Sequence, residues 1–255
     1  MDKKIDTIRE KYFSPLERME LLGSFLFYIS AILSFIILLI DESMYPKIYD
    51  IIQISFLLVV FVLCIVSISI RLHFSPRAQE YRYKDFLSHA YKLPLGEEQT
   101  KKYYNNNQDI PVKCIAAQTL ENSFYSKNTA LEMVKNERVK VASYVFIWLV
   151  AMLNRSTDLA WISIVAQLVL SEQILSRWLR IEWLGFKFER TFDDIFRLIQ
   201  GGKDGNFFEV NTLEIAGRYE MAKSNAGITL SSKIFDESKE KMDKEWKGIR
   251  KLLGL

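Results

Sequence analysis

Two uninterrupted apolar stretches decide the fold class of this chain. Residues 21–40 read LLGSFLFYISAILSFIILLI, and residues 51–70 read IIQISFLLVVFVLCIVSISI, so that each holds 20 consecutive residues without a charge. As a helix, 20 residues extend about 30 Å, which is the thickness of a bilayer's hydrocarbon core. The other residues are more polar, which is why 255 residues can average 49% hydrophobic and 25% charged. The two stretches predict a transmembrane hairpin and argue against an ordinary soluble enzyme.

The flanking charges predict the orientation of this hairpin. Residues 1–20 mix bases and acids, and no small-residue cleavage site follows them, so we expect no signal peptide and an attached N-terminus. The link at residues 41–50 has one lysine and three acids, whereas bases gather after residue 70. Positive charge marks the cytoplasmic side, so both ends of the hairpin are expected there.

A second, shorter apolar pair follows at residues 141–153 and 159–175, interrupted by Glu172. Thirteen residues of helix extend only about 20 Å, a length that is more typical of a buried core helix. The tight NRSTD turn between the two stretches, with Lys140 and Arg177 able to snorkel at their ends, nevertheless favours a transmembrane hairpin. The alternative is a soluble or interfacial helical hairpin packed on the first pair.

We therefore expect an all-α membrane protein with four transmembrane helices in two hairpins and a helical cytoplasmic domain, both termini being cytoplasmic. The expected segments are a cytoplasmic N-terminal helix at 1–20, the first hairpin at 21–71, a cytoplasmic helical linker at 72–140, the second hairpin at 141–176, and a cytoplasmic helical region for ligand sensing or oligomerisation at 177–255.

Within the polar regions, helix-start and helix-stop residues predict the elements. Ser75-Pro76 should start a helix that Pro94 ends, residues 96–111 should form a loop, and Pro111 should open the next helix. Residues 175–199 should continue the fourth apolar segment without a break until Gly201-Gly202. Two further helices are expected. They cover residues 212–223 and an amphipathic tail at 231–253, which we expect to serve packing or oligomerisation.

Basic residues after the fourth segment form the first candidate site. They recur at spacings of 3, 7, 3 and 7, which keeps them on one broad side of a helix, and they are Arg177, Arg180, Lys187, Arg190 and Arg197. Such a stripe could bind phosphates. It could equally contact lipid headgroups or pair with neighbouring acids, which are Glu189, Asp193 and Asp194.

The sequence gives little support for enzymatic chemistry. Cys64 and Cys114 form no disulfide framework, and His73 and His89, both expected at the surface, lie in no zinc-binding pattern. GxSxG, GxxxxGK[ST] and GxGxxG are all absent from the sequence. We expect neither an enzyme nor a bound metal or cofactor.

Polar residues inside the apolar segments form the second candidate site. In a membrane such groups turn toward protein partners or water, so they serve either as interhelical contacts or as the lining of a pore. The candidates are Ser30 and Ser34 on the first segment and Ser163, Gln167, Ser171 and Glu172 on the fourth. Four helices of one chain would fill their own centre, so a pore requires several copies, and we expect a homo-oligomer with a tetramer favoured.

Several local patterns resemble the SMODS-associated four-transmembrane effector family of bacterial antiphage operons. Ala78-Gln79-Glu80 followed by Leu93-Pro94-Leu95 is similar to that family's AxxQExFD…LPW pattern, although no tryptophan follows Pro94. Residues 117–123, AQTLENS, resemble its CQxEN element. Residues 232–235, SKIF, resemble its QDxIF element loosely, since Ser232 and Lys233 replace glutamine and aspartate.

The resemblance implies an inner-membrane pore gated by a cyclic or linear oligonucleotide that a partner nucleotidyltransferase makes. Related Hailong-type systems use linear DNA oligomers that hold such a channel closed. The phosphate-contact candidates would be the basic stripe together with Lys101, Lys102 and Lys113, because arginine offers bidentate geometry to phosphate. No duplex nucleic acid is expected as a partner. The competing hypothesis is a non-conducting membrane adaptor that anchors a cytosolic partner.

Overall fold

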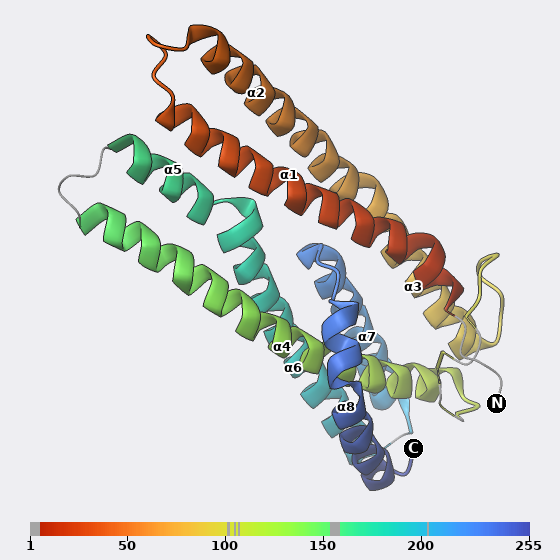
Figure 1. The fold of residues 1–255 in the computed structure, drawn as a ribbon. Coiled ribbons are helices and arrows are strands. Elements are labelled where there is room, and N and C mark those ends of the chain that lie inside the picture. The colour runs from red at the N-terminus through yellow and green to blue at the C-terminus, as the bar shows by residue number, and fades with distance from the viewer. Residues whose placement is uncertain (1–5, 101–102, 105, 107, 154–158, 203) are drawn as a thin grey trace. The chain divides into compact units, whose positions relative to one another are not determined.

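The computed structural model describes residues 6–100, 103–104, 106, 108–153, 159–202 and 204–255, and every regular element among them is a helix (Figure 1). This confirms the all-α prediction. The elements are the π-helical turn η1 (Arg9–Phe13), α1 (Ser14–Leu39), α2 (Pro46–Ser69), the π-turn η2 (Ile70–Phe74), α3 (Ser75–Tyr91), α4 (Pro111–Leu153), α5 (Leu159–Val169), the π-turn η3 (Glu172–Ser176), α6 (Arg177–Gly201), α7 (Asn206–Ala226) and α8 (Ser232–Leu253).

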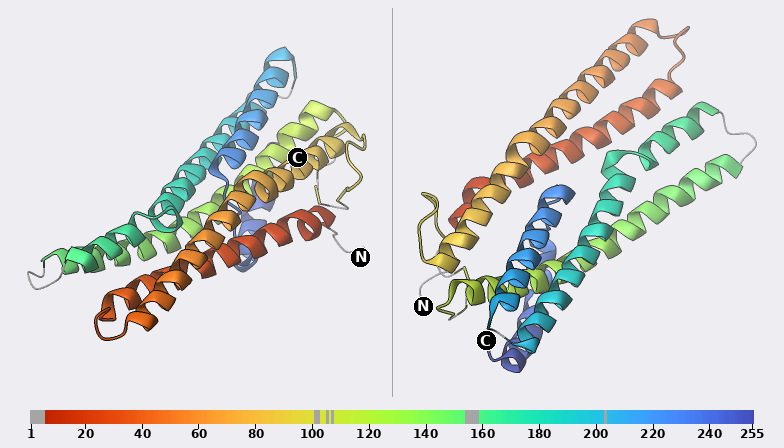
Figure 2. Two further views of the ribbon diagram at one scale, coloured as in Figure 1. Left: turned by 90° about the horizontal axis from the view of Figure 1, so that it is seen from above. Right: turned by 180° about the vertical axis from the view of Figure 1, so that it is seen from behind.

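The chain divides into two compact units. The first, which we call the helical body, comprises Met1–Pro15, Ser75–Lys135 and Arg180–Leu255. The second, which we call the hairpin unit, comprises Leu16–Phe74 and Asn136–Leu179. In the hairpin unit, α1 and α2 run side by side in opposite directions, and so do α5 and the last part of α4 (Figure 2).

Two helical runs are long and apolar enough to cross a membrane, Arg9–Leu39 and Pro46–Tyr91. The apolar window of the second run is only 6% buried, whereas a core helix of a soluble protein is mostly buried. The two helices touch at Gly23, where an added Cβ would meet Val66 at 3.6 Å, an ordinary van der Waals distance. The first hairpin therefore has the length, the composition and the exposure of a membrane-spanning pair.

The helix predicted to start at Ser75-Pro76 is confirmed as α3, and the π-turn η2 joins it to α2 so that the chain stays helical from Pro46 to Tyr91. Proline lacks an N–H group, and its ring clashes with the carbonyl one turn earlier. The wider π-turn η2 lies directly before this Ser-Pro pair, and η1 lies directly before Ser14-Pro15. A π-turn thus precedes each proline and lets the helix pass through it.

The second apolar pair differs from the prediction in two ways. Residues 141–153 are the end of the 43-residue helix α4, and α5 has only 11 residues, about 16 Å of helix. Residues 175–199 are helical as expected, in η3 and α6, but their unbroken continuation from the fourth apolar segment is wrong, because Ser171 is extended (φ −63°, ψ 159°) and separates α5 from η3. Its carbonyl accepts hydrogen bonds from the N–H groups of Ile174 and Ser176, which restart the helix. The NRSTD turn lies outside the described residues.

The helical body has an aromatic core between α4, α6, α7 and α8. Trp246 of α8 lies 5.5 Å from Phe124 of α4 between ring centroids, and the Tyr125 hydroxyl donates to Asp243 at 2.7 Å. Met242 and Leu253 are buried in the same cluster. The apolar face of the tail therefore packs inside its own chain, which confirms the packing alternative for residues 231–253.

The predicted helix ends are confirmed, with one extension. Lys92 has a positive φ of 55° just after α3 and before Pro94, and Gly202 has a φ of 133° just after α6. The helix expected at 212–223 is α7, which is longer at both ends. It stops at Gly227, a left-handed cap whose N–H bonds to the carbonyl of Lys223.

Candidate functional site

The polar residues of α5 are the most exposed of the predicted pore candidates. Ser163 and Gln167 are exposed on a short helix that is otherwise apolar, and Glu172 is exposed at the start of η3, after the break. Ser171 lies at the break after α5, and its hydroxyl is buried with no hydrogen-bond partner among the described residues. A polar stripe and a helix break therefore occur together in the second hairpin.

The candidates on the first segment lie in a different setting. Ser30 is buried, and its hydroxyl donates to the carbonyl of Phe27 at 2.8 Å. Ser34 is half-buried. Ser30 and Ser34 therefore suit contact between helices, which was the alternative to a pore-lining role.

A charged cluster joins α4 to α6 within the hairpin unit. The carboxylate of Glu137, a buried residue, lies 3.2 Å from Lys140 Nζ and 3.5 Å from Arg177 Nε. A buried carboxylate requires such partners, because desolvation penalises an unpaired charge. Arg177 already takes part in an ion pair, so a phosphate at Arg177 would have to compete with Glu137.

The remaining members of the basic stripe belong to the helical body, where they have separate surroundings. Arg190 lies 4.0 Å from Asp194, as one alternative predicted, and an Arg180 nitrogen donates to the carbonyl of Ala226 at 3.4 Å. Lys187 lies over the ring of Trp183, and Arg197 is exposed. Lys113, on α4, pairs with Asp204 at 2.7 Å. Lys101 and Lys102 lie outside the described residues. Any phosphate that binds here must compete with carboxylates for Arg190 and Lys113.

A polar cluster that the sequence did not reveal lies between α3, α4 and the loop before α4. Gln118 is fully buried, and its amide nitrogen is 2.7 Å from His89 Nδ1 and 3.3 Å from Cys114 Sγ. Cys114 Sγ is 3.2 Å from Asn106 Oδ1. His73 is exposed as expected, and His89 is half-buried where α3 packs against α4. The only sequence signal was Gln118 itself, within the CQxEN-like element.

The electrostatics of this cluster do not favour nucleophilic chemistry. Burial lowers the pKa of His89, and the charge of Lys92 lowers it further, against the raising effect of Asp85. Burial raises the pKa of Cys114, although its hydrogen bond to Asn106 opposes the rise. A thiol must ionise to act as a nucleophile, so these shifts favour a neutral, hydrogen-bonded role in packing.

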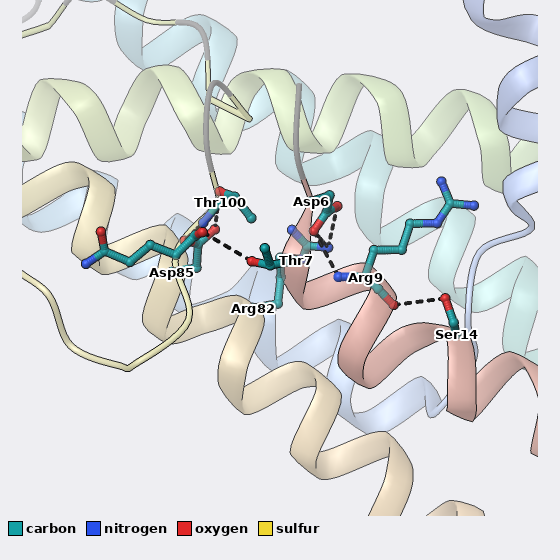
Figure 3. A network of polar contacts seen from close by, with 8 residues as sticks. Asp6, Thr7, Arg9, Ser14, Arg82, Asp85 and Thr100 are labelled. Carbon is teal, nitrogen blue, oxygen red and sulfur yellow. Dashed lines mark hydrogen bonds and ion pairs between the residues drawn. The ribbon is translucent and has the colours of Figure 1, made fainter. Parts of the chain in front are cut away.

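The N-terminal segment docks onto α3 through a second network, drawn in Figure 3. Arg82 donates to both carboxylate oxygens of Asp6, at 2.9 and 3.1 Å, and lies 4.5 Å from the ring centre of Tyr103. Burial by itself lowers the pKa of Arg82, but Tyr103 and Asp6 raise it above its ordinary value. Asp85 accepts from the backbone N–H and the hydroxyl of Thr100, which ties the following loop to α3.

Among the described residues, no group of three or more His, Cys, Asp or Glu side chains could hold a metal ion. No protein-family model, curated protein or solved structure matches the chain.

Proposed function

We propose that the protein is a pore-forming effector of the bacterial inner membrane that acts in antiphage defence as a homo-oligomer, gated by a nucleotide or oligonucleotide from a partner nucleotidyltransferase. The observation that carries the proposal is the exposure of Ser163 and Gln167 on α5. In a bilayer these side chains are costly against lipid and turn toward water or a partner helix. The local motifs that resemble the antiphage effector family supply the biological setting.

Four spans are part of this proposal. The end of α4 and α5 form the second, shorter hairpin, and the break at Ser171 places non-helical backbone next to it. Irregular backbone at membrane depth is tolerated only where protein buries it or water lines it. The break therefore supports a water-facing position for this end of α5, with both termini in the cytoplasm.

Several copies are needed to enclose a channel, and a tetramer is favoured. Side chains of one hairpin unit already fill its centre, where Phe27, Val141 and Ile174 form a common buried cluster. A channel must then lie between subunits, lined by the exposed face of α5 from each copy.

Gating would act through the helical body. A ligand shifts a closed–open equilibrium only if it binds one state more tightly. Arg180, Lys187, Arg190, Arg197 and Lys113 are the proposed phosphate contacts. Binding would displace Asp194 from Arg190 and Asp204 from Lys113, so the ion pairs of the structure would compete with the ligand.

Planar-bilayer recording tests the proposal. We expect the purified protein to conduct, and synthetic linear and cyclic oligonucleotides to change its open probability. Gln167→Leu should lower the single-channel current about tenfold, while Ser143→Ala, an exposed position on α4, should leave it unchanged. Absence of current under every one of these conditions would sink the proposal.

A non-conducting membrane adaptor is the second candidate, and the length of α5 favours it. An 11-residue helix is well below the roughly 20 residues that a span requires. A topology reporter fused after Leu153 separates the two: four spans place it on the periplasmic side of the inner membrane, whereas a two-span adaptor keeps it in the cytoplasm.

A further inference from the structure

The outward face of α8 is basic toward the C-terminal end of the helix. Four lysines there are exposed, and none of them has a hydrogen bond or an ion pair to a described residue. We call these four residues the lysine stripe: Lys241, Lys244, Lys247 and Lys251. At 100° per residue they lie within an arc of about 120°, and the one further residue in that arc between the first and the last lysine is Gly248. The surface is therefore uniformly basic over about 15 Å of helix.

The acids of α8 lie away from the lysine stripe. Asp243 accepts a hydrogen bond from the hydroxyl of Tyr125 at 2.7 Å, which turns this carboxylate toward α4. Glu245 lies outside the arc of the stripe. Glu237 and Glu240 are on the same side of the helix but precede the stripe. Although acids and bases nearly balance over the whole helix, the positive charge is concentrated in its C-terminal half.

We propose that the lysine stripe binds the phosphodiester backbone of a single-stranded oligonucleotide. The inference rests on the proposed gating by an oligonucleotide and adds a contact surface for that ligand. A nucleic-acid strand with stacked bases carries one phosphate per about 3.4 Å, so a length of about 15 Å spans about four phosphates. The stripe therefore offers about one ammonium group for each phosphate along its length.

The composition of the lysine stripe favours a nucleic acid over a protein or a membrane. Protein–protein interfaces are depleted in lysine and depend on apolar or aromatic anchors, and no apolar side chain lies in the arc between Lys241 and Lys251. A helix that lies on a membrane inserts its apolar face into the lipid. The apolar face of α8 is packed inside the chain, where Met242 and Trp246 are buried. Charge is therefore what this surface offers to a partner.

A phosphate at the lysine stripe has no carboxylate to displace, in contrast to the basic residues proposed above. Arg190 lies 4.0 Å from Asp194, and Lys113 lies 2.7 Å from Asp204, so a phosphate at either base must first break an ion pair. On α8 the phosphates replace only water and counterions. A Cβ added at Gly248 would meet nothing within 4 Å, so a strand can also lie close to the helix at this point.

The salt dependence of oligonucleotide binding tests the lysine stripe. The assay is the fluorescence anisotropy of a labelled single-stranded DNA of mixed sequence, titrated with the full-length protein in nanodiscs of zwitterionic lipid. Each lysine–phosphate contact contributes about −0.7 to the slope of log K against log salt, so four contacts give a slope of at least about −2.8. The wild type should therefore bind roughly 50-fold more weakly at 200 mM salt than at 50 mM. Lys244→Gln combined with Lys247→Gln should reduce the magnitude of the slope by about 1.4.

A matched control removes the same charge from α8 outside the stripe. Lys233→Gln combined with Lys239→Gln alters two exposed positions and should keep the wild-type slope. All four substituted lysines are exposed, so helical content by circular dichroism should be unchanged in both double variants. An unchanged slope in the Lys244→Gln, Lys247→Gln variant, or an equal change in the control, overturns the inference.

Two further outcomes would assign the stripe to another partner and so overturn the inference. Displacement of the DNA by an equal concentration of poly-glutamate of the same charge would indicate an acidic protein. Loss of DNA binding in nanodiscs of phosphatidylglycerol would indicate that the stripe binds the membrane. If the Lys244→Gln, Lys247→Gln variant keeps the wild-type slope and bilayer currents still respond to the oligonucleotide, the proposed pore stands without this surface. A wild type that neither conducts nor binds the DNA overturns both.

Discussion

Removing the carboxylate of Asp6 should release the N-terminal segment from α3. The side chains of Arg82 and Asp6 are only 12% and 17% exposed, and one guanidinium nitrogen contacts both carboxylate oxygens. Breaking a fully buried pair costs about 3–5 kcal/mol, because the remaining charge stays desolvated. Partial exposure lowers this figure, and we expect Asp6→Asn to cost about 2 kcal/mol of local stability.

Hydrogen exchange measures this quantity directly. The amide of Glu10 donates to the backbone carbonyl of Asp6 at 3.2 Å, an acceptor that Asp6→Asn keeps, so it reports on the docked state of the segment. A loss of about 2 kcal/mol should speed its exchange about 30-fold where exchange follows local opening. Amides of the α8 core should exchange at the wild-type rate.

A neighbouring ion pair gives the control. Lys11 pairs with Glu98, but the lysine side chain is more than half exposed. Solvent screens such an exposed pair and leaves it weak, so Lys11→Met should leave the same exchange close to the wild-type rate. Equal effects of Asp6→Asn and Lys11→Met would refute the reasoning that burial makes the Arg82 pair the stronger one.

Three further predictions concern the cores of the two units. Trp246→Ala should lower the free energy of unfolding by about 3–5 kcal/mol, since it empties the space beside Phe124, and a loss below about 1 kcal/mol in urea unfolding would contradict the packing described. His89 has a pKa below its ordinary 6.5, so the unfolded chain takes up the proton more readily. The stabilisation from neutral His89 should be full above pH 6.5 and fall as the pH drops below 6.5, and His89→Gln should flatten this part of the thermal-unfolding profile. Glu137→Gln should cost about 1–2 kcal/mol, because Lys140 and Arg177 lose their shared carboxylate, and an unchanged melting temperature in detergent would argue against that cluster.

The sequence predicted correctly those features that depend on a single helix, such as its length, its ends and its apolar face. Uncharged runs of 20 residues marked α1 and α2, because helix length against bilayer thickness is a property of the segment alone. Gly201-Gly202 marked a helix end for a similar reason, since glycine accepts a backbone conformation that other residues avoid. The apolar positions of residues 231–253 predicted a packed face, and Met242 and Trp246 are indeed buried.

A sequence pattern marks both π-turns, but the spacing of apolar residues does not identify them. Each precedes a Ser-Pro pair, at Ser14-Pro15 and at Ser75-Pro76. Proline at the start of a helix and proline inside a π-bulged helix look alike in sequence, and only the hydrogen bonds of the preceding turn distinguish them.

The amino-acid sequence by itself determined the all-helical class, the two long apolar helices and most helix ends, because these follow from side-chain hydrophobicity and backbone preference within short windows. The tertiary structure alone decided which charges pair and which polar groups meet. It brought Arg177 to Glu137, Arg82 to Asp6, and His89 to Gln118 and Cys114. These partners come from distant parts of the chain, so only the packing of whole helices brings them within a few ångströms.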